Sequence, residues 1–420
     1  MRIALVCHVY PPEFQTAAGL VRELAEDLVQ AGHHVTVLTG WPNHPRGILY
    51  EGWRARFRSV EREPKGFRVI RCDHSIHPRD KVSWRLWYYF TFGVSTFVNG
   101  LAAGPFDAVL CLSTPIFGSW TAWVLARLKG ARFVYDIFDL HPEAARNAGL
   151  LREGFVYHLW RRIDTLLCRK SDVIATLSDG MKAEIVARGI APDKIVVIPF
   201  WMDAERVRPG SRDHNPWRRR HQIPDETFVA LYAGTIGYLS GAEILVETAR
   251  LLADRPDILI LLVGEGAVKD AVEQRAAALG LRNLGFLPFQ PAEVLEEMYA
   301  AADVGLVTLL PESGKTSVPS KILGYLAAGR GIVASVADDG ATAQVVREFD
   351  CGVVAGSQDP KALAEALRAL ADDRERVRRL GENARRCLLE RYSRQTCTGM
   401  YESVLVSGRA RAPVRGGSPD

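Results

Sequence analysis

The sequence predicts an α/β protein of two tandem Rossmann-like, doubly wound domains with a cleft between them. Three observations lead to this prediction. The chain has 420 residues, more than one hydrophobic core usually supports. Short β-branched runs alternate with amphipathic helical stretches, which is typical of a parallel sheet covered by helices on both faces. This alternation starts a second time after a polar, proline-bounded and basic segment at residues 209–225, which we expect to be a linker.

The first domain is expected over residues 1–208. It begins with the apolar run at 2–7 (RIALVC), a strand candidate. Apolar residues then recur at helical spacing over 20–31, and a glycine follows, so a helix is expected there. Further strands are expected over 34–39, 108–112, 132–136, 172–176 and 194–198.

Residues 86–106 contain no charged side chain, and their number matches a bilayer span. Two internal glycines, an asparagine and a proline near the end make this a weak span. A buried helix or a helix that docks on a surface is favoured, because aromatic helices flanked by arginine also suit a membrane interface.

The second domain is expected over residues 226–385. Its strands are predicted over 228–233, 258–263, 304–309 and 331–335, and its helices include 242–252, 291–302 and 360–371. A C-terminal helix over 386–406 is expected to pack back on the first domain. Residues 407–420 are rich in Pro, Gly and Arg and are expected to be disordered.

The net charge of +4 is too small to argue for a nucleic-acid partner, and none is expected. Basic residues gather at 46–85 and 217–221. Such clusters suit an anionic ligand or an anionic membrane, and they are equally typical of a solvated face.

The seven cysteines are scattered, without a C-x-x-C pair, and several lie in apolar runs. This pattern predicts buried free thiols in a reducing cytosol, with neither a disulfide framework nor a zinc site.

Three glycine-containing turns follow strands or begin helices in the second half. Residues 234–237 (GTIG) and 263–266 (VGEG) each follow a strand, where glycines let backbone N–H groups approach a phosphate. Residues 316–329 (TSVPSKILGYLAAG) place Lys321 where a helix should begin, with Ser317 or Ser320 as its cap. Each has a plainer interpretation, a tight turn or a capped core helix, and neither G-x-G-x-x-G nor a Walker A sequence occurs.

In the first half, the run at 136–143 (DIFDLHPE) places three carboxylates and a histidine directly after a strand, where catalytic groups sit in this architecture. The alternative is a polar loop with one helix cap, Asp139 or Glu143. The spacing matches no metal site, and no metal is expected.

Taken in order, these motifs resemble the retaining glycosyltransferases of family four, whose two-domain fold is called GT-B. The resemblance rests on GTIG, VGEG and SVPSK…YLAAG in the second half, and it covers roughly residues 1–405. The DLHPE run at 139–143 is similar to a motif of the branch that builds bacterial surface polysaccharides.

The resemblance implies transfer of a hexosyl or acetamidosugar group from a nucleoside-diphosphate sugar to a hydroxyl, with retained configuration and no metal or other cofactor. It places the donor on the second domain and a glycan acceptor, expected to be lipid-linked, on the first. A cytoplasmic location is expected, with peripheral contact at the inner, anionic face of the membrane. The expected catalytic residues are Asp139, His141, Glu143 and Lys321. The expected donor-binding residues are Gly19, Gly234, Thr235, Gly237, Gly264, Gly266, Leu287, Thr316, Ser317, Ser320 and Lys321.

The sequence also departs from the pattern of the family. Thr316 and Gly324 stand where most members carry a pair of glutamates, and Glu312 and Lys315 are nearby substitutes. Residues 238 and 240 are Tyr and Ser in place of Arg and Lys, and the N-terminal glycine-rich loop, 16–19, retains one glycine. Two alternatives therefore stay open: an enzyme acting on a small secondary metabolite, or a catalytically impaired binding or partner subunit.

Overall fold

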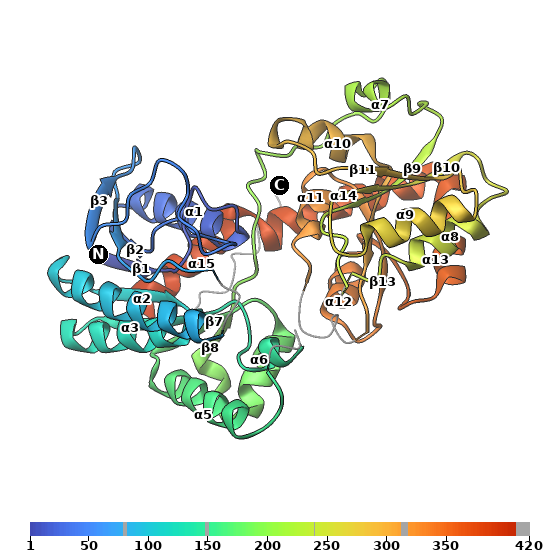
Figure 1. Cartoon of the computed structure of the whole chain (residues 1–420). Helices are drawn as coiled ribbons and strands as arrows, with labels where there is room; N and C mark the ends of the chain where they lie inside the picture. The colour runs from blue at the N-terminus through green and yellow to red at the C-terminus, as the bar shows by residue number, and fades with distance from the viewer. Residues whose placement is uncertain (79–81, 148–150, 239, 312–317, 409–420) are drawn as a thin grey trace. The chain divides into compact units, whose positions relative to one another are not determined.

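The computed structural model describes residues 1–78, 82–147, 151–238, 240–311 and 318–408. The chain forms two compact α/β units (Figure 1). Unit 1 contains residues 1–177, 181–199 and the chain from 397 on, and unit 2 contains 178–180 and 200–396. Each unit has its own sheet, and almost all strand pairs are parallel, which confirms the predicted fold class.

The sheet of unit 1 has eight strands in the order β3-β4-β2-β1-β5-β6-β7-β8. All neighbours are parallel except β3 and β4, an antiparallel hairpin at the edge that the sequence analysis did not predict. Side chains of β3 alternate between exposed and half-buried, so the segment lacks the apolar run by which the predicted strands were recognised. The strands at Arg68–Cys72, Leu284–Leu287 and Gly352–Gly356 were not predicted either. The strands are β1 (Arg2–Val6), β2 (His34–Thr39), β3 (Arg58–Arg62), β4 (Arg68–Cys72), β5 (Ala108–Leu112), β6 (Arg132–Ile137), β7 (Val173–Thr176) and β8 (Ile195–Val197).

Helices α2 (Val82–Ala102), α3 (Ile116–Lys129) and α5 (Phe155–Lys170) lie over one face of this sheet; α2 packs on β2 and β4, and α3 and α5 bury side chains against β5 and β6. Figure 1 shows α2 and α3 side by side. They approach closely at glycines: a Cβ on Gly93 would lie 2.6 Å from the Phe117 ring, and one on Gly100 2.5 Å from Leu125. Gly93 and Gly100 thus serve helix packing. None of the helices within the described ranges is long and apolar enough to cross a membrane.

The remaining helices of this part of the chain are α1 (Thr16–Gln30), α4 (Glu143–Asn147), α6 (Asp179–Ala187) and α15 (Arg394–Ser407). From Cys397 on, α15 belongs to unit 1. Its Tyr401 hydroxyl donates to Asp136 Oδ2 at 2.9 Å, and the Leu405 carbonyl accepts from Arg132. Residues 386–406 therefore do not form one helix. They contain the end of α14 (Arg374–Cys387), a π-helical turn and most of α15, and the expected disordered tail falls largely outside the described residues.

The sheet of unit 2 has the order β11-β10-β9-β12-β13-β14, and all its neighbours are parallel. Side chains of β9 alternate between two cores. Val229 and Leu231 face α10, α11, α12 and α14, whereas Ala230 and Tyr232 face α8, α9 and α13. The strands are β9 (Phe228–Ala233), β10 (Ile258–Val263), β11 (Leu284–Leu287), β12 (Val304–Thr308), β13 (Gly331–Val336) and β14 (Gly352–Gly356). The helices named are α8 (Ile244–Leu251), α9 (Lys269–Ala278), α10 (Leu295–Ala301), α11 (Lys321–Ala327), α12 (Ala341–Glu348) and α13 (Pro360–Asp372).

Residues 209–225, expected as a linker, lie within unit 2 and contain helix α7 (Pro216–Arg220). This segment is part of unit 2 because its residue Arg218 is fully buried there. Arg218 pairs with Asp303 at 3.0 Å and donates to the carbonyls of Ala301, Pro224 and Thr227. Because these contacts satisfy the guanidinium inside the unit, a segment of linker-like composition is folded here.

All seven cysteines are free and buried, which confirms the prediction of buried free thiols.

Candidate functional site

The strand order of unit 2 reverses at β9, whose neighbours are β10 on one side and β12 on the other. In open α/β sheets, ligands bind beyond the carboxyl ends of the strands at such a reversal. The GTIG turn at 234–237 starts directly after β9, so the predicted donor-binding glycines lie at the place where this architecture binds ligands.

The two glycine turns that follow β9 and β10 pack backbone against backbone. Gly234, Gly264 and Gly266 have φ values of +137°, +157° and +158°, which side chains rarely tolerate. A Cβ on Gly264 would overlap the carbonyl of Gly234, and one on Gly266 would overlap that of Ile236. The Ile236 N–H donates to Glu265 O, and the Gly264 N–H donates to Leu287 O, each at 2.9 Å. The predicted Gly234, Gly264, Gly266 and Leu287 are therefore brought together.

Lys321 crosses the end of β9 at Gly234. It begins α11 on one face of the sheet, yet its Nζ lies 3.6 Å from the centroid of the Tyr232 ring, which belongs to the other face. A Cβ on Gly234 would lie 3.4 Å from Lys321 Cε, an ordinary van der Waals contact, so the lysine side chain passes close beside the Gly234 backbone. Its ammonium group thereby reaches the carboxyl edge of the sheet.

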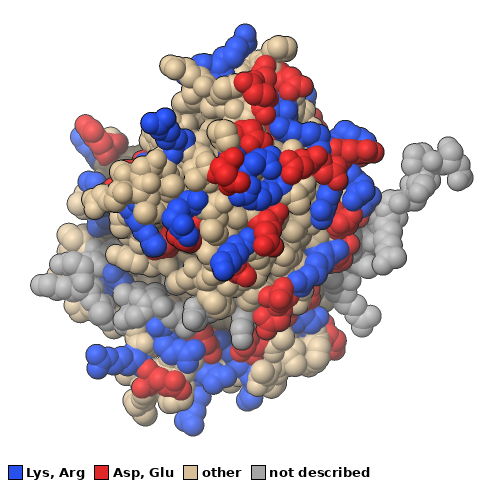
Figure 2. All heavy atoms as spheres, turned by 90° about the vertical axis from the view of Figure 1, so that its right-hand side faces the viewer, with Lys and Arg blue, Asp and Glu red and all other residues tan. Residues whose placement is uncertain are grey.

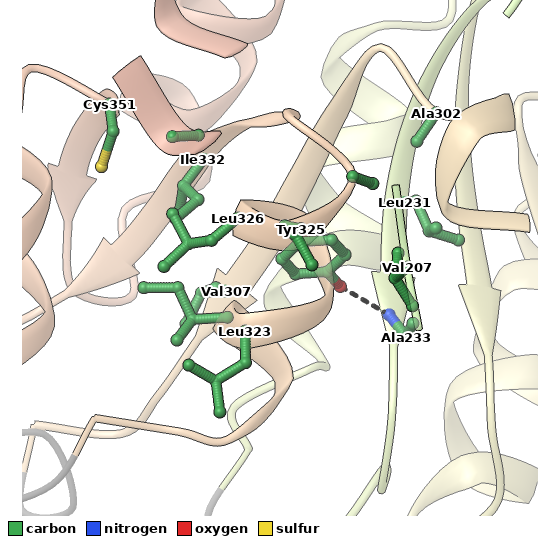
Figure 3. Packing of buried hydrophobic residues seen from close by; sticks show 14 of the residues in the cluster. Val207, Leu231, Ala233, Ala302, Val307, Leu323, Tyr325, Leu326, Ile332 and Cys351 are labelled. Atoms are coloured by element: carbon green, nitrogen blue, oxygen red, sulfur yellow. Dashed lines mark hydrogen bonds between the residues drawn. The ribbon is translucent and has the colours of Figure 1, made fainter. Parts of the chain in front are cut away.

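Tyr325 fixes α11 in this position (Figure 3). Its hydroxyl accepts from the Ala233 N–H at 2.7 Å and reaches Leu306 O at 3.3 Å, so it joins α11 to the end of β9 and the middle of β12. Its ring occupies the space beside Gly305, where a Cβ would overlap it. Because Lys321 precedes Tyr325 by four residues, both lie on the same side of α11, and the buried hydroxyl therefore aims the lysine at the turn.

Lys321 has no carboxylate within ion-pairing distance among the described residues, and the Tyr232 ring is its favourable contact. Burial lowers the pKa of its ammonium group to about 7. A buried cation without a counter-ion is costly unless an anion joins it. This part of unit 2 is therefore suited to a ligand that carries negative charge, such as a diphosphate.

The other donor-binding candidates differ in what they can supply. Thr235 is exposed and Gly237 is half-buried, and the turn is braced by Thr308, whose hydroxyl donates to Ser240 O at 2.6 Å. Ser320 is exposed and its side chain does not cap α11, contrary to one sequence interpretation. Helix α11 has only seven residues, so Lys321 rather than a helix dipole supplies the positive charge.

A side chain at position 324, where the resemblance implies a glutamate, would require Tyr299 to move. A Cβ on Gly324 would overlap the ring of Tyr299, which stacks edge-on against Tyr325 with centroids 5.7 Å apart. Thr316, Ser317 and the substitutes Glu312 and Lys315 lie outside the described residues.

In unit 1 the structure separates the three candidates of the DLHPE run. Asp139 is exposed beyond the end of β6. His141 stacks on Trp160 and its Nε2 lies 3.1 Å from the Thr114 hydroxyl, and burial lowers the pKa of its imidazole. Glu143 pairs with the buried Arg188 at 2.6 Å, and Arg188 also pairs with Asp164 at 2.7 Å. Of the three, Asp139 is exposed, and His141 is half-buried with no hydrogen-bond partner at Nδ1 among the described residues.

Residues 16–19 form the first turn of α1 rather than a glycine-rich loop. Gly19 is exposed and a Cβ on it would have nothing within 4 Å, so neither a turn nor a close contact requires glycine there.

The sequence analysis missed a polar network beyond the ends of β1, β2 and β4. The buried carboxylate of Glu13 accepts from the N–H groups of Asn43 and His44, each at 2.9 Å. The backbone N–H of Trp41 donates to His74 Nε2 at 2.9 Å. These residues are far apart in sequence. The feature of the sequence that could have indicated the network is that each of them follows a strand. In the described part of the chain, no group of His, Cys, Asp and Glu could hold a metal ion.

Two family profiles match the chain. The profile described as "Glycosyl transferase 4-like domain" matches residues 17–201, and that described as "Glycosyl transferases group 1" matches residues 213–387. The second match contains both glycine turns and Lys321.

Among curated proteins, the chain is 28% identical over 338 residues to the putative colanic acid biosynthesis glycosyl transferase WcaI of Escherichia coli K12, covering 78% of this chain and 82% of WcaI. Among solved structures, sucrose-phosphate synthase of Thermosynechococcus elongatus superposes with a TM-score of 0.73 at 20% identity, covering 96% of this chain and 98% of that one. HepE of Anabaena, solved with UDP and glucose, gives a TM-score of 0.68 at 16% identity, with 97% and 100% covered.

Proposed function

Because the chain belongs to the two-domain, family-four type of glycosyltransferases that build surface polysaccharides, we propose that it moves a sugar from a nucleoside-diphosphate sugar to a hydroxyl of a glycan acceptor. The observation that carries the donor assignment is Lys321, a half-buried lysine that crosses β9 at Gly234 without a carboxylate partner among the described residues. A donor diphosphate would supply the missing negative charge.

The proposed mechanism stabilises the leaving group. As the bond between the sugar C1 and the diphosphate oxygen breaks, positive charge develops on the sugar and negative charge on the diphosphate. Lys321 and the N–H groups of the 234–237 turn are placed to hold that negative charge, and such pre-positioned groups lower a barrier more than they aid substrate binding. We propose a metal-independent reaction because this lysine supplies the charge that a cation would otherwise bring.

We propose that the configuration at C1 is retained. The acceptor oxygen bonds to C1 on the face that the diphosphate leaves, and its proton passes to the departing phosphate oxygen. This route balances without a side-chain base. Asp139, exposed beyond β6, is assigned to acceptor binding on unit 1, whereas Glu143 is reassigned to folding because Arg188 holds it.

We propose a lipid-linked glycan as acceptor and the cytoplasm as location, with the enzyme at the inner face of the membrane. The likeness to WcaI supports a polysaccharide context, and a solved structure similar in fold, WaaG, is described as involved in lipopolysaccharide biosynthesis. Seven reduced cysteines support a reducing compartment.

The test is incubation of the protein with radiolabelled sugar nucleotides and a lipid-linked acceptor, with and without a chelator, followed by NMR of the product at the anomeric carbon. We expect transfer with retained configuration that survives chelation. Absence of transfer and of donor hydrolysis with every donor would refute the proposal.

One observation favours a second candidate, a catalytically impaired binding subunit. Tyr299 fills the space at Gly324 where most members place a carboxylate. Such a protein would show stabilisation by sugar nucleotides in a thermal-shift screen but neither transfer nor hydrolysis. Transfer to a small secondary metabolite in place of the lipid-linked acceptor would support the remaining alternative.

A further inference from the structure

The outward side of α2 is apolar along most of its length. The side chains of Trp87, Phe90, Val94, Val98 and Leu101 recur every three or four residues, and between 38% and 50% of each is exposed. Outward-facing positions of a surface helix are normally polar. In this helix the polar residues Thr96 and Asn99 are buried instead, so its polarity is reversed.

Helix α3 extends this apolar side. Phe117 lies 5.0 Å from Phe90 between ring centroids, and Phe117, Val124 and Leu128 are exposed at helical spacing. Leu128 is 63% exposed. The two helices therefore present one continuous apolar surface, which we call the α2–α3 face.

Helix α5 lies over the same side of the sheet and carries a second exposed apolar row. Phe155 and Val156 are 81% and 60% exposed, and Leu159, Ile163 and Leu166 continue the row. Lys170 of α5 lies 5.0 Å from the Trp123 ring of α3, so α5 adjoins α3.

The charges of these three helices have one sign. Helix α2 contains Arg85, α3 contains Arg127 and Lys129, and α5 contains four further Lys or Arg residues. Their one acidic residue, Asp164, is buried and pairs with Arg188. Arg161 of α5 also pairs with Glu143 of α4, at 3.4 Å. A surface that combines exposed aromatic and aliphatic side chains with basic ones matches an anionic lipid surface.

We propose that the outward sides of α2, α3 and α5 form a docking surface for an anionic membrane, on which unit 1 lies with these helices along the lipid headgroups. This inference goes beyond the proposed transfer reaction and does not depend on it. Charge complementarity favours lipid over the alternative occupants, because a second copy would bring basic residues against basic residues.

Unit 2 shows what an ordinary solvated surface of this protein looks like. Figure 2 shows acidic and basic side chains interspersed on the side that carries α8, α9 and α13. Many of them pair, as Arg255 does with Asp257 and Asp372, each at 2.8 Å. The one-signed helices of unit 1 therefore differ from this side of unit 2.

The test is flotation of the full chain, without donor or acceptor, with vesicles of phosphatidylcholine alone and of phosphatidylcholine mixed with phosphatidylglycerol. We expect binding to the mixed vesicles and at least about a tenfold loss of it in the double variant Val98→Glu, Leu128→Glu, which removes apolar contact and adds repelled charge. Leu279→Glu, at an exposed leucine of unit 2, is the matched control and should bind as the parent does.

Arg127→Gln with Arg162→Gln should lower binding to the mixed vesicles and leave binding to phosphatidylcholine unchanged. Leu128→Glu alone, at the most exposed position of the face, keeps the test valid if the double variant unfolds. Equal flotation of Leu128→Glu and the parent would overturn the proposal. The proposal would also be overturned if the parent protein bound no vesicles but sedimented as a dimer, and if Leu128→Glu dissociated that dimer. Absence of vesicle binding would leave hydrolysis of a sugar nucleotide in solution unaffected. The two proposals can therefore fail independently.

Discussion

The carboxyl edges of the two sheets carry polar groups of different kinds. Beyond β9 in unit 2, two glycine turns stack backbone on backbone, and Lys321 lies over them on the Tyr232 ring with no carboxylate partner among the described residues. Beyond β6 in unit 1, the charged groups face each other: Glu143 and Asp164 both pair with Arg188.

This difference distinguishes a candidate ligand-binding site from a set of polar groups that stabilises the fold. Charges that satisfy one another inside a fold stabilise a loop and have little left to offer a ligand. A cation held by packing alone remains costly until an anion arrives, so its pairing energy is available for binding. By this criterion Lys321 is the strongest candidate for ligand binding among the described residues of unit 2, and Asp139 is the exposed candidate of the DLHPE run.

The largest expected effect is that of Lys321→Met, which keeps the aliphatic packing on Gly234 and removes the charge. We expect donor affinity to fall about 100-fold, because loss of a desolvated charge pair costs about 3 kcal/mol. Calorimetric titration with UDP and GDP sugars measures it. The matched control is Lys361→Met in α13, a lysine outside the site, which should bind donor as the parent does. Unchanged affinity in Lys321→Met would show that the diphosphate binds elsewhere.

A substitution in the stacked turns tests whether their glycines are structural. Gly264→Ala should lower the free energy of unfolding by about 3 kcal/mol, because the new Cβ overlaps the Gly234 carbonyl at a φ of +157°. Urea unfolding followed by circular dichroism measures this loss.

Gly19→Ala in α1 is the control for that prediction. Because Gly19 is helical and its surroundings are open, alanine should leave stability unchanged or raise it by less than about 1 kcal/mol. A large loss of stability in Gly19→Ala would mean that residues 16–19 form a strained loop after all.

These two glycines also show what the sequence could and could not predict. Local patterns were sufficient for most of the parallel strands and for the turn at Gly264, because β-branched runs and strand-end glycines act within a few residues. They did not predict the parallel strands β4, β11 and β14. The path of Lys321 across Gly234 depends on the hydrogen bond between Tyr325 and Ala233 at the end of β9. These two residues are 92 positions apart in the sequence, so no local pattern could reveal the contact. The same holds for Arg218, whose partner Asp303 makes a linker-like segment part of unit 2, and for Glu143, whose partner Arg188 lies 45 residues on.

A smaller effect should separate Glu143 from Asp139 in unit 1. Glu143→Gln should reduce the free energy of unfolding by about 2 kcal/mol, because it removes a partner of the buried Arg188. Asp139→Asn should leave stability unchanged, since Asp139 is exposed, and should reduce transfer to the acceptor. Unfolding curves and transfer assays on both variants measure the difference. If Glu143→Gln abolished transfer without loss of stability, Glu143 would be catalytic as the sequence first indicated.

The last effect expected in unit 2 is a pH dependence that arises at Lys321. Burial lowers the pKa of Lys321 to about 7, below its value in the unfolded chain, so between these values the unfolded chain binds more protons. Without donor, Lys321 should therefore add stability as pH rises above 7. Donor binding should do the reverse: a diphosphate requires the ammonium form, so affinity should fall by at most about tenfold per pH unit above 7, with uptake of up to one proton. Calorimetry in buffers of different ionisation enthalpy measures that uptake. Lys321→Met should abolish it, and uptake that persisted in this variant would assign the titrating group to another residue.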